Sequence, residues 1–374
     1  MKKITLYLVV LCCAVVSCAT SGGEKPFEPY LQIRPESLSF DAKGGVEDVQ
    51  VLANFDYEIV PSVDWLSAEK DNSRDFWIKV TAAASKVTKE RSGEISIVSK
   101  VDNTSKSIKV SQSAYVKPIN TDGWAEMPAK VEDANLEYCY HDKLPSNKKL
   151  RNYSFCFDKE KHCALWVAYP LHSCYTEGNG HRTDDWGYDP CCVDDTYEPS
   201  LFNAYYPQGG SKYSHSRGHQ LPSADRLASD EDNATTFYFT NMTPQLQSLN
   251  GASWGSLEGD IRKKWMCSDT LYVVTGAHFA AGYGYAYDNK GNGKACAVPT
   301  HYYKVILRTK KGNSGKWVGN CSANELQCVG FWFDHAGGAA RQTMSVAEIE
   351  KKTGHTFFPN VKNAPKSTYN ASEW

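Results

Sequence analysis

Residues 213–226, YSHSRGHQLPSADR, combine side chains that could carry catalysis with residues that interrupt regular structure. A neutral histidine such as His219 is a suitable general base near pH 7, because its ordinary pKa lies close to that pH. Arg217, two positions earlier, offers a planar pair of N–H donors that fits a phosphate. Gly218 permits a tight bend, and Pro222 ends any regular element soon afterwards. The segment has no helical or strand period, and it indicates a base and an anion-binding group held over a cleft.

The other histidines are weaker candidates for catalysis. A single histidine in a folded protein is more often a hydrogen-bonded structural residue than a catalytic one. We therefore expect His215, His172 and His301 to be structural.

Two further segments carry polar residues that a core does not require. Residues 178–190, GNGHRTDDWGYDP, contain Arg182. Residues 236–262, TFYFTNMTPQLQSLNGASWGSLEGDIR, contain Asn241, Asn250, Glu258 and Arg262.

In the later segment, a helix would bring several of these side chains onto one face. Asn250, Trp254, Glu258 and Arg262 are spaced four residues apart and would form one stripe. One interpretation is a surface helix with a Glu258–Arg262 ion pair and a half-buried Trp254. The other is a functional face that presents Asn250 and Glu258. The spacing alone does not decide between them.

The elements that must position these residues belong to one large domain, residues 125–374. Residues 162–171 (HCALWVAYPL) and 270–279 (TLYVVTGAHF) predict buried strands, because they are apolar runs of strand length. Residues 300–308 (THYYKVILR) alternate and predict another strand, whereas residues 252–265 (ASWGSLEGDIRKKW) predict a helix. Strands and helices mixed in this way indicate an α+β fold.

The preceding part of the chain has a different composition. Residues 30–115 contain no Cys and no His, and they consist of short alternating runs separated by turn residues. Such regularly spaced runs predict an all-β sandwich. Residues 116–124 carry Pro and Gly and indicate a linker, so the chain is multidomain.

The first residues are a targeting segment. Residues 1–17 join a basic start, MKK, to an apolar run too short for a membrane span, which predicts a signal peptide. The sequence VVSCAT resembles a bacterial lipobox, which implies cleavage before Cys18 and lipid on its thiol. Residues 18–29 would then be a lipidated tether, and the protein an exported lipoprotein at the outer membrane or cell surface, with the periplasmic face as an alternative. A plain secretory signal with a chance cysteine is the other interpretation.

Cysteine use agrees with export. Apart from Cys12, Cys13 and Cys18, ten of the 13 cysteines remain, and all lie beyond residue 138. An even number in an exported domain predicts disulfide bonds, while zinc is disfavoured because no two CxxC pairs occur at finger spacing. The ten are Cys139, Cys156, Cys163, Cys174, Cys191, Cys192, Cys267, Cys296, Cys321 and Cys328.

Several motifs of the large domain occur in the order seen in one enzyme family. SRGHQLPSADR, TNMTPQ, LN and W...LE...R, preceded by WVAYPL and HRTDDWGYDP, resemble the DNA/RNA non-specific endonucleases. These are ββα-metal nucleases with a DRGH motif. The resemblance implies metal-dependent hydrolysis of phosphodiester bonds in DNA and RNA, without base recognition. The formal net charge of −2 excludes wholesale electrostatic capture of nucleic acid, so the phosphate-binding surface must be local.

The resemblance also implies a role for each matching residue. His219 would remove a proton from the attacking water. Asn250 would be the one direct protein ligand of Mg²⁺, with Mn²⁺ as an alternative metal. Arg217 and Arg182 would bind the scissile phosphate and the charge that builds on it.

Three further positions complete the comparison with the family. Asn241 would help to order the site, Glu258 would orient metal-bound water, and Arg262 would add a contact nearby. Ser216 departs from the family, which has Asp at this position. Because a hydroxyl is a weaker acceptor than a carboxylate, this departure puts the orientation of the site in question.

Residues 30–115 resemble another family, the immunoglobulin-like BACON domain. The matching pieces are PESLSF, GG, DWLS, KERSGEISI and KVSQSA, whereas Tyr57 stands where that family usually has Trp. The resemblance implies contact with glycans or a role as a spacer, and Trp65 and Trp77 would be either sugar platforms or core residues. The alternative function is therefore a surface glycan-binding lipoprotein with an inactive nuclease-like domain. Paired acids in TDD and VDDT make a glycosidase a third, weaker hypothesis.

Overall fold

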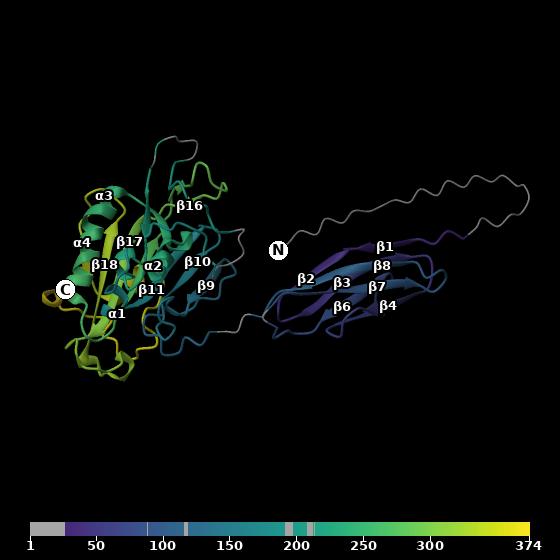
Figure 1. Cartoon of the computed structure of the whole chain (residues 1–374), viewed down its shortest axis with the longest axis horizontal. Helices are drawn as coiled ribbons and strands as arrows, with labels where there is room; N and C mark the ends of the chain where they lie inside the picture. Colours follow the sequence, from purple (N-terminus) through teal and green to yellow (C-terminus); the bar gives the residue numbers. More distant parts are fainter. Residues whose placement is uncertain (1–26, 88, 116–118, 191–196, 208–211, 213) are drawn as a thin grey trace, which may run out of the picture. The chain divides into compact units, whose positions relative to one another are not determined.

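The computed structural model describes residues 27–374, except for residues 88, 116–118, 191–196, 208–211 and 213. Two compact units make up the chain (Figure 1): one ends before residue 119, and the other comprises Ile119–Trp374. The proposed signal peptide and Cys18 lie outside the described residues. Among the described residues, no helix is long and apolar enough to span a bilayer.

The first unit consists of two four-stranded sheets (Figure 1). One sheet has the strand order β1 (Leu31–Arg34), β3 (Gly45–Ala53), β6 (Trp77–Ala82) and β5 (Leu66–Lys70). The other has the order β2 (Ser37–Phe40), β8 (Ser105–Gln112), β7 (Arg91–Ser99) and β4 (Tyr57–Pro61). Alternate residues of both sheets, such as Val49, Val51, Ile95 and Ile97, form one core. This agrees with the predicted all-β sandwich, while the immunoglobulin-like BACON assignment stays a prediction.

Trp65 and Trp77, the two tryptophans of the first unit considered as sugar platforms, are half-buried, and an arginine packs over each ring. Trp65 packs against the sandwich core, with the Arg91 guanidinium 4.3 Å from its ring centre. Trp77 has the Arg74 guanidinium 4.9 Å from its ring centre. An arginine therefore covers part of each ring, and Trp65 also packs against the core, while the choice between sugar platform and packing residue stays a prediction.

The second unit is built on a seven-stranded antiparallel sheet. The predicted strands at 162–171, 270–279 and 300–308 are confirmed and lie side by side at its centre. The order is β19 (Gln342–Met344), β18 (Leu326–Asp334), β17 (His301–Thr309), β14 (Leu271–His278), β11 (Cys163–Leu171), β10 (Tyr153–Asp158) and β9 (Leu136–His141). The alternation seen in β17 does not separate a core face from a solvent face, because residues 302–307 are all buried.

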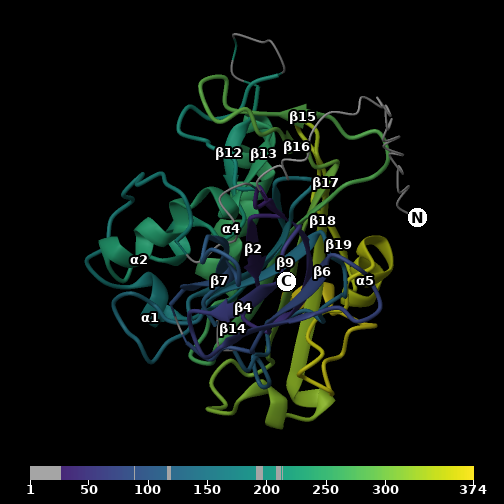
Figure 2. The ribbon, with the colours of Figure 1, turned by 90° about the vertical axis from the view of Figure 1, so that its right-hand side faces the viewer.

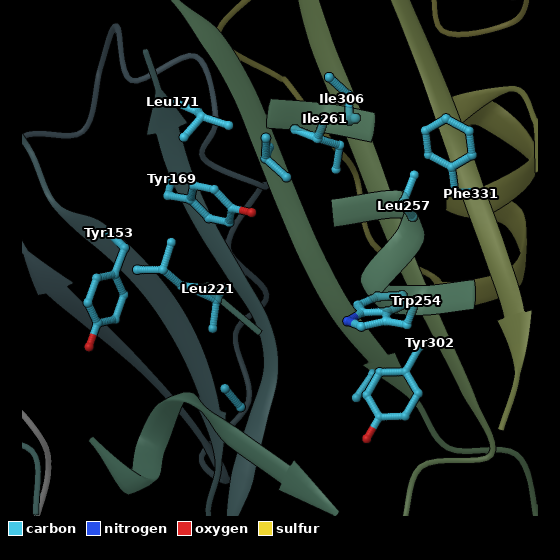
Figure 3. Packing of buried hydrophobic residues seen from close by; sticks show 14 of the residues in the cluster. Tyr153, Tyr169, Leu171, Leu221, Trp254, Leu257, Ile261, Tyr302, Ile306 and Phe331 are labelled. Carbon is cyan, nitrogen blue, oxygen red and sulfur yellow. The ribbon is translucent and has the colours of Figure 1, made fainter. Parts of the chain in front are cut away.

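Both faces of this sheet are covered, so the unit has a core on each side. A long helical segment, residues 247–265, packs on one face, where Leu249, Leu257 and Ile261 join a cluster with strand residues (Figure 3). The helix α5 (Val346–Thr353) contributes Val346 and Ile349 to the cluster on the other face. Figure 2 shows α4 and α5 on opposite sides of β17 and β18.

The helical segment is not one regular α-helix. It consists of α3 (Gln247–Leu249), a π-helical turn η4 (Asn250–Trp254), α4 (Gly255–Asp260) and a second π-helical turn η5 (Ile261–Trp265). Ala252 has φ −116° and ψ −108°, which marks a kink inside η4. The predicted helix at 252–265 is confirmed, but it begins earlier and its turns are wider than expected. This matters for the site because Asn250 opens the first wide turn.

A small two-stranded sheet precedes the helical segment. Its strands β12 (Ser216–His219) and β13 (Met242–Gln245) pair antiparallel, and α3 follows β13 directly. The expectation that SRGH has no strand structure is therefore wrong. The reason is tertiary pairing: Gly218 lies opposite Thr243, and a Cβ on Gly218 would come 2.6 Å from the Gln245 side chain. Gly218 therefore serves close strand packing rather than a tight bend.

The remaining elements are short connections around the two sheets. They include the pair β15 (Tyr285–Ala286) and β16 (Cys296–Ala297). The short helices and turns are α1 (Ser173–Thr176), η1 (Ser223–Asp225), α2 (Asp230–Ala234), η2 (Thr235–Phe237), η3 (Phe239–Asn241), η6 (Val318–Asn320), η7 (Ala323–Glu325) and η8 (Ala371–Glu373).

The predicted disulfide bonds are absent from the described residues, which corrects that expectation. Cys139, Cys156, Cys163, Cys174, Cys267, Cys296, Cys321 and Cys328 are all free thiols, while Cys191 and Cys192 lie outside the described residues. Cys139 and Cys156 show why: they lie on the neighbouring strands β9 and β10, but they pack into cores on opposite faces of the sheet. Most of the eight are buried and act as small apolar side chains.

Candidate active site

The predicted site residues meet at a cavity of ≈ 570 Å³ in the second unit. Strand β12, the start of the helical segment, residues 180–186 and the turn at 222–227 form its wall. The predicted residues that line it are Arg182, Ser216, Arg217, His219, Asn250 and Glu258. Asn241 and Arg262, which were also predicted, are not among its lining residues.

His219 ends strand β12 and stands between two aromatic rings. Its ring centre lies 5.6 Å from that of Trp186 and 4.9 Å from that of Phe237, in edge-to-face contact with both. Its Nε2 atom is buried and has no hydrogen-bond partner among the described residues. Burial, together with the charges of Arg182 and Arg217, lowers the pKa of His219 to about 3. The imidazole is therefore neutral near pH 7, as a general base must be.

Both arginines of the site lie over the same aromatic pair. The Arg217 guanidinium lies 3.4 Å from the centre of the Trp186 ring, and its Nη1 donates to the backbone oxygens of Leu201 and Phe202 at 3.0 and 3.1 Å. The Arg182 guanidinium lies 4.8 Å from the Phe237 ring. Fixed by these contacts, the guanidinium of Arg217 is held ready to bind an anion at the cavity wall.

Arg182 is held less firmly than Arg217. Its side chain is 53% exposed, and it forms an ion pair of 2.8 Å with Asp184, which is equally exposed. Exposed ion pairs of this kind contribute little to stability. An anionic substrate can therefore compete with Asp184 for this guanidinium at low energetic cost.

Asn241 is buried behind the cavity and holds the chain that follows His219. Its Oδ1 accepts a hydrogen bond from the backbone N–H of Leu221 at 2.8 Å. Its Nδ2 donates to the backbone oxygens of Leu221 and Thr236 at 3.0 and 2.8 Å. All these partners are backbone groups, so Asn241 holds two segments of backbone together and does not line the cavity.

Asn250 lies in the first π-helical turn, and its position depends on two side chains outside the helix. Ser216 on β12 donates a hydrogen bond of 2.5 Å to Oε1 of Gln247, one helical turn before Asn250. The backbone N–H of Leu246, which precedes the helix, donates to Nε2 of His335 at 2.8 Å. These two links fix the start of the helix against β12 and against the end of β18.

Glu258 lines the cavity about two turns further along the helical segment, next to a buried lysine. Lys304 on β17 is fully buried, and its Nζ lies 4.0 Å from Oε1 of Glu258. The ammonium also donates to Thr275 Oγ1 at 2.6 Å and to the backbone oxygen of Gln220 at 3.4 Å. Burial raises the pKa of Glu258, and the positive charge of Lys304 opposes that rise.

Arg262 does not pair with Glu258, contrary to the simple helical interpretation. Its Nη1 lies 2.8 Å from Oδ1 of Asp225, a carboxylate that is almost completely buried. Arg262 lies in a π-helical turn, whose hydrogen bonds join residues five apart rather than four, so the regular four-residue stripe is not kept there. Arg262 therefore acts on Glu258 through its charge, which lowers the pKa of that carboxyl group.

The oxygen donors at this cavity suit a hard cation. Within the described residues, the side-chain amide of Asn250 makes no hydrogen bond, and the Glu258 carboxylate lies on the same wall. No cluster of three or more His, Cys, Asp or Glu occurs among the described residues. This donor set fits Mg²⁺, which prefers oxygen and keeps several of its waters, better than it fits zinc.

Four residues of the site were not found from the sequence as functional candidates: Trp186, Gln247, Lys304 and His335. Lys304 could have been found from the sequence, since it is the one charged side chain in the predicted strand HYYKVIL. The others became visible only through contacts between distant segments. The three histidines expected to be structural, His215, His172 and His301, do not line the cavity.

Comparison with known proteins agrees with this arrangement. The family model for DNA/RNA non-specific endonucleases matches residues 138–364. A nuclease of Nostoc sp. is 30% identical over 217 residues, covering 56% of this chain and 72% of that protein. Human mitochondrial endonuclease G is 28% identical over 226 residues, covering 58% and 71%. The nuclease of Serratia marcescens is 32% identical over 198 residues, covering 51% and 66%.

Among solved structures, a complex of EndoG with EndoGI aligns with 58% of this chain and 87% of that chain, at 21% identity and a TM-score of 0.43. The family match covers most of the second unit, including every residue that lines the cavity. The chain belongs to the DNA/RNA non-specific endonuclease family, and it is a hydrolase that cleaves nucleic acid.

Proposed function

We propose that the second unit hydrolyses phosphodiester bonds of DNA and RNA without base specificity, with His219 as the general base and Mg²⁺ as the cofactor. One observation carries the proposal. The neutral His219 presents a buried Nε2 without a protein partner in the described chain, in a cavity that also holds two arginines and two oxygen donors. This is the set of groups that water activation beside a phosphate requires.

His219 would take the proton of a water molecule that attacks the phosphorus. The low pKa keeps the imidazole neutral, and with its one proton on Nδ1 the lone pair of Nε2 would be available at physiological pH. The edge-on rings of Trp186 and Phe237 hold the imidazole in one orientation. Positioned proton transfer of this kind contributes about 10²- to 10⁴-fold to a rate.

Arg217 and Arg182 would bind the phosphate oxygens and stabilise the charge that builds on them. The transition state carries more negative charge than the substrate, so fixed cations favour it over the bound ground state. Arg217 is oriented by backbone oxygens, whereas Arg182 would exchange its exposed partner Asp184 for the substrate.

Asn250 and Glu258 would hold the metal, the first through its amide oxygen and the second through hydrogen bonds to coordinated water. When bound, Mg²⁺ supplies charge stabilisation to the phosphate and to the leaving oxygen. Lys304 beneath Glu258 would favour the ionised carboxylate, which is the form that accepts hydrogen bonds from such waters.

Sequence independence follows from the groups present. Contacts to phosphates position a nucleic acid but carry no base information. We therefore propose that both DNA and RNA are substrates, and that binding weakens as salt rises. A membrane anchor at Cys18 and export to the cell surface remain part of the proposal, with the first unit as a spacer or a glycan contact.

A direct assay tests this function. The chain from residue 19 onward is incubated with plasmid DNA and with RNA, with Mg²⁺, with Mn²⁺ and with EDTA. Both substrates should be degraded with metal, and degradation should stop with EDTA and in His219→Ala. Metal-independent degradation, or full activity of His219→Ala, would overturn the proposal. A glycan array with the same protein tests the alternative of glycan binding.

A further inference from the structure

Two large aromatic side chains lie exposed beside the cavity and contact each other. Tyr188 is 46% exposed and Phe202 is 52% exposed, and their ring centres are 6.0 Å apart at an interplanar angle of 80°. Single exposed apolar residues are common on protein surfaces, but a contacting aromatic pair next to a binding cavity points to a ligand.

A third, fully buried ring holds this pair in place. Phe239 lies 4.8 Å from Phe202 and 5.3 Å from Tyr188, in perpendicular contact with both. Its backbone N–H donates to the Gly187 oxygen at 3.0 Å, which ties the segment before Tyr188 to η3. The same turn η3 ends at the buried Asn241. The exposed rings therefore stand on a rigid base that also belongs to the site.

The aromatic pair is adjacent to the arginine proposed to bind the scissile phosphate. The Arg217 guanidinium donates to the backbone oxygen of Phe202 at 3.1 Å and lies 3.4 Å over Trp186, two residues before Tyr188. A phosphate bound at Arg217 would therefore have its own nucleotide, or the next one along the strand, beside the two exposed rings.

We propose that Tyr188 and Phe202 form a stacking site for an unpaired nucleobase next to the cleaved phosphodiester. Every base has a π-face, so stacking on aromatic rings adds affinity without sequence preference. In a duplex the bases are already stacked and paired, and one must be extruded at an energetic cost before it can reach the rings. The site therefore favours single-stranded nucleic acid and unpaired regions. This inference rests on the proposed nuclease function and specifies its substrate.

Binding without cleavage tests the stacking site directly. All proteins carry His219→Ala and are kept in EDTA, and the probes are single-stranded oligonucleotides with or without one abasic position. An abasic position keeps the phosphates but removes a base. For the protein with both rings, the probe whose missing base is the one that would reach the rings should bind roughly tenfold more weakly than the complete probe. After Tyr188→Ala with Phe202→Ala, the two probes should bind equally well.

A fluorescent base gives a second readout that reports stacking itself. Fluorescence of 2-aminopurine in the single strand should be quenched on binding, and the double alanine variant should abolish the quenching. Tyr188→Phe and Phe202→Tyr keep a ring at each position and should preserve it. Tyr369→Ala is the matched control, because Tyr369 is 39% exposed and does not line the cavity.

The inference is overturned if the alanine variants, folded as judged by circular dichroism, keep the full penalty for the abasic probe and the full quenching. Those results would mean that the rings only cover Phe239 or contact another protein. Failure of the nuclease proposal would look different. Metal-dependent cleavage would be missing, while the quenching and its loss in the variants could still be measured.

Discussion

The Ser216 hydroxyl donates a hydrogen bond of 2.5 Å to Oε1 of Gln247, and this contact joins strand β12 to the helix that carries Asn250. The resemblance to the DRGH motif implies Asp at the position of Ser216, so a neutral link stands here where that motif has a carboxylate. Gly251 leaves room for the Gln247 side chain, because a Cβ at that position would come 2.9 Å from its Nε2. The site is therefore ordered by geometry rather than by an additional negative charge.

Substitutions at Ser216 should separate these two contributions. Ser216→Ala removes the link, and we expect a loss of about 1 kcal/mol in the free energy of unfolding together with a several-fold loss of activity. Ser216→Asp adds a carboxylate beside the proposed metal site, and we expect a lower dissociation constant for Mg²⁺. Urea unfolding and calorimetric titration with Mg²⁺ measure the two effects. Unchanged Mg²⁺ affinity in Ser216→Asp would contradict the expectation that a negative charge at position 216 strengthens metal binding.

Loss of His219 should abolish catalysis while leaving substrate binding. We expect His219→Ala to reduce kcat/KM by about 10²- to 10⁴-fold, because the proton acceptor is lost but the arginines remain. Plasmid cleavage gives the rate, and an oligonucleotide binding assay gives the affinity. His215→Ala is the control: His215 contacts Ser214 through Nδ1 and does not line the cavity, so its rate should be close to that of the unaltered protein.

Lys304→Met should shift the pH dependence of the reaction. The charge of Lys304 lowers the pKa of Glu258, so its removal should raise that pKa and leave less of the carboxylate ionised at pH 7. One unit of pKa corresponds to about tenfold in the ionised fraction. We expect the acid limb of kcat/KM to move to higher pH, and the two proteins to converge above pH 8, because burial lowers the pKa of Lys304 itself to about 8.

A second substitution shows whether the shift acts through Glu258. In a Glu258→Gln background no carboxyl group remains to titrate, so adding Lys304→Met should leave the shape of the pH profile unchanged. An identical shift in both backgrounds would show that Lys304 acts elsewhere.

His335 should make stability depend on pH. Its Nδ1 lies 2.6 Å from the Pro299 oxygen and its Nε2 accepts from Leu246, so the neutral form is the one that fits. Burial lowers its pKa to about 4, below the ordinary 6.5. Between these values the unfolded chain takes up a proton that the folded protein does not, so the free energy of unfolding should fall as the pH falls from 6.5 to 4.

His335→Gln tests this relationship, because glutamine can make both hydrogen bonds but cannot titrate. The decline in stability between pH 7 and pH 5 should be shallower in the variant than in the unaltered protein, as measured by urea unfolding. His355, whose pKa burial also lowers to about 4, contributes equally to both proteins. Parallel declines would contradict the role given to His335.

The sequence predicted the central strands from local patterns, and its motifs pointed to six of the residues that line the cavity. Apolar runs of strand length became β11 and β14, and the motif around His219 placed Arg217 and His219 together. The contacts between these elements could not be predicted from local patterns, because they depend on how distant segments pack together. Whether Lys304 is buried depends on β17 lying between β14 and β18, and strand order is not a local property.

Two errors have specific physical causes. One of the two interpretations of the helix, a Glu258–Arg262 ion pair, assumed a regular α-helix, whereas Arg262 pairs with Asp225 instead. The expected disulfide bonds rested on an even count of cysteines. Cys139 and Cys156 lie one position apart in the pairing of β9 with β10. Their side chains pack into cores on opposite faces of the sheet.

The lysine under Glu258 and the histidine at the helix start come from β17 and from just beyond β18, far along the chain from the ββα segment that they support. A fragment that keeps only residues 213–265 would retain the motif but lose both supports. We therefore expect the smallest active form of this nuclease to extend at least through residue 335, so that it keeps both supports. If residues 213–265 were transplanted alone into another scaffold, we expect them to bind phosphate but not to catalyse hydrolysis.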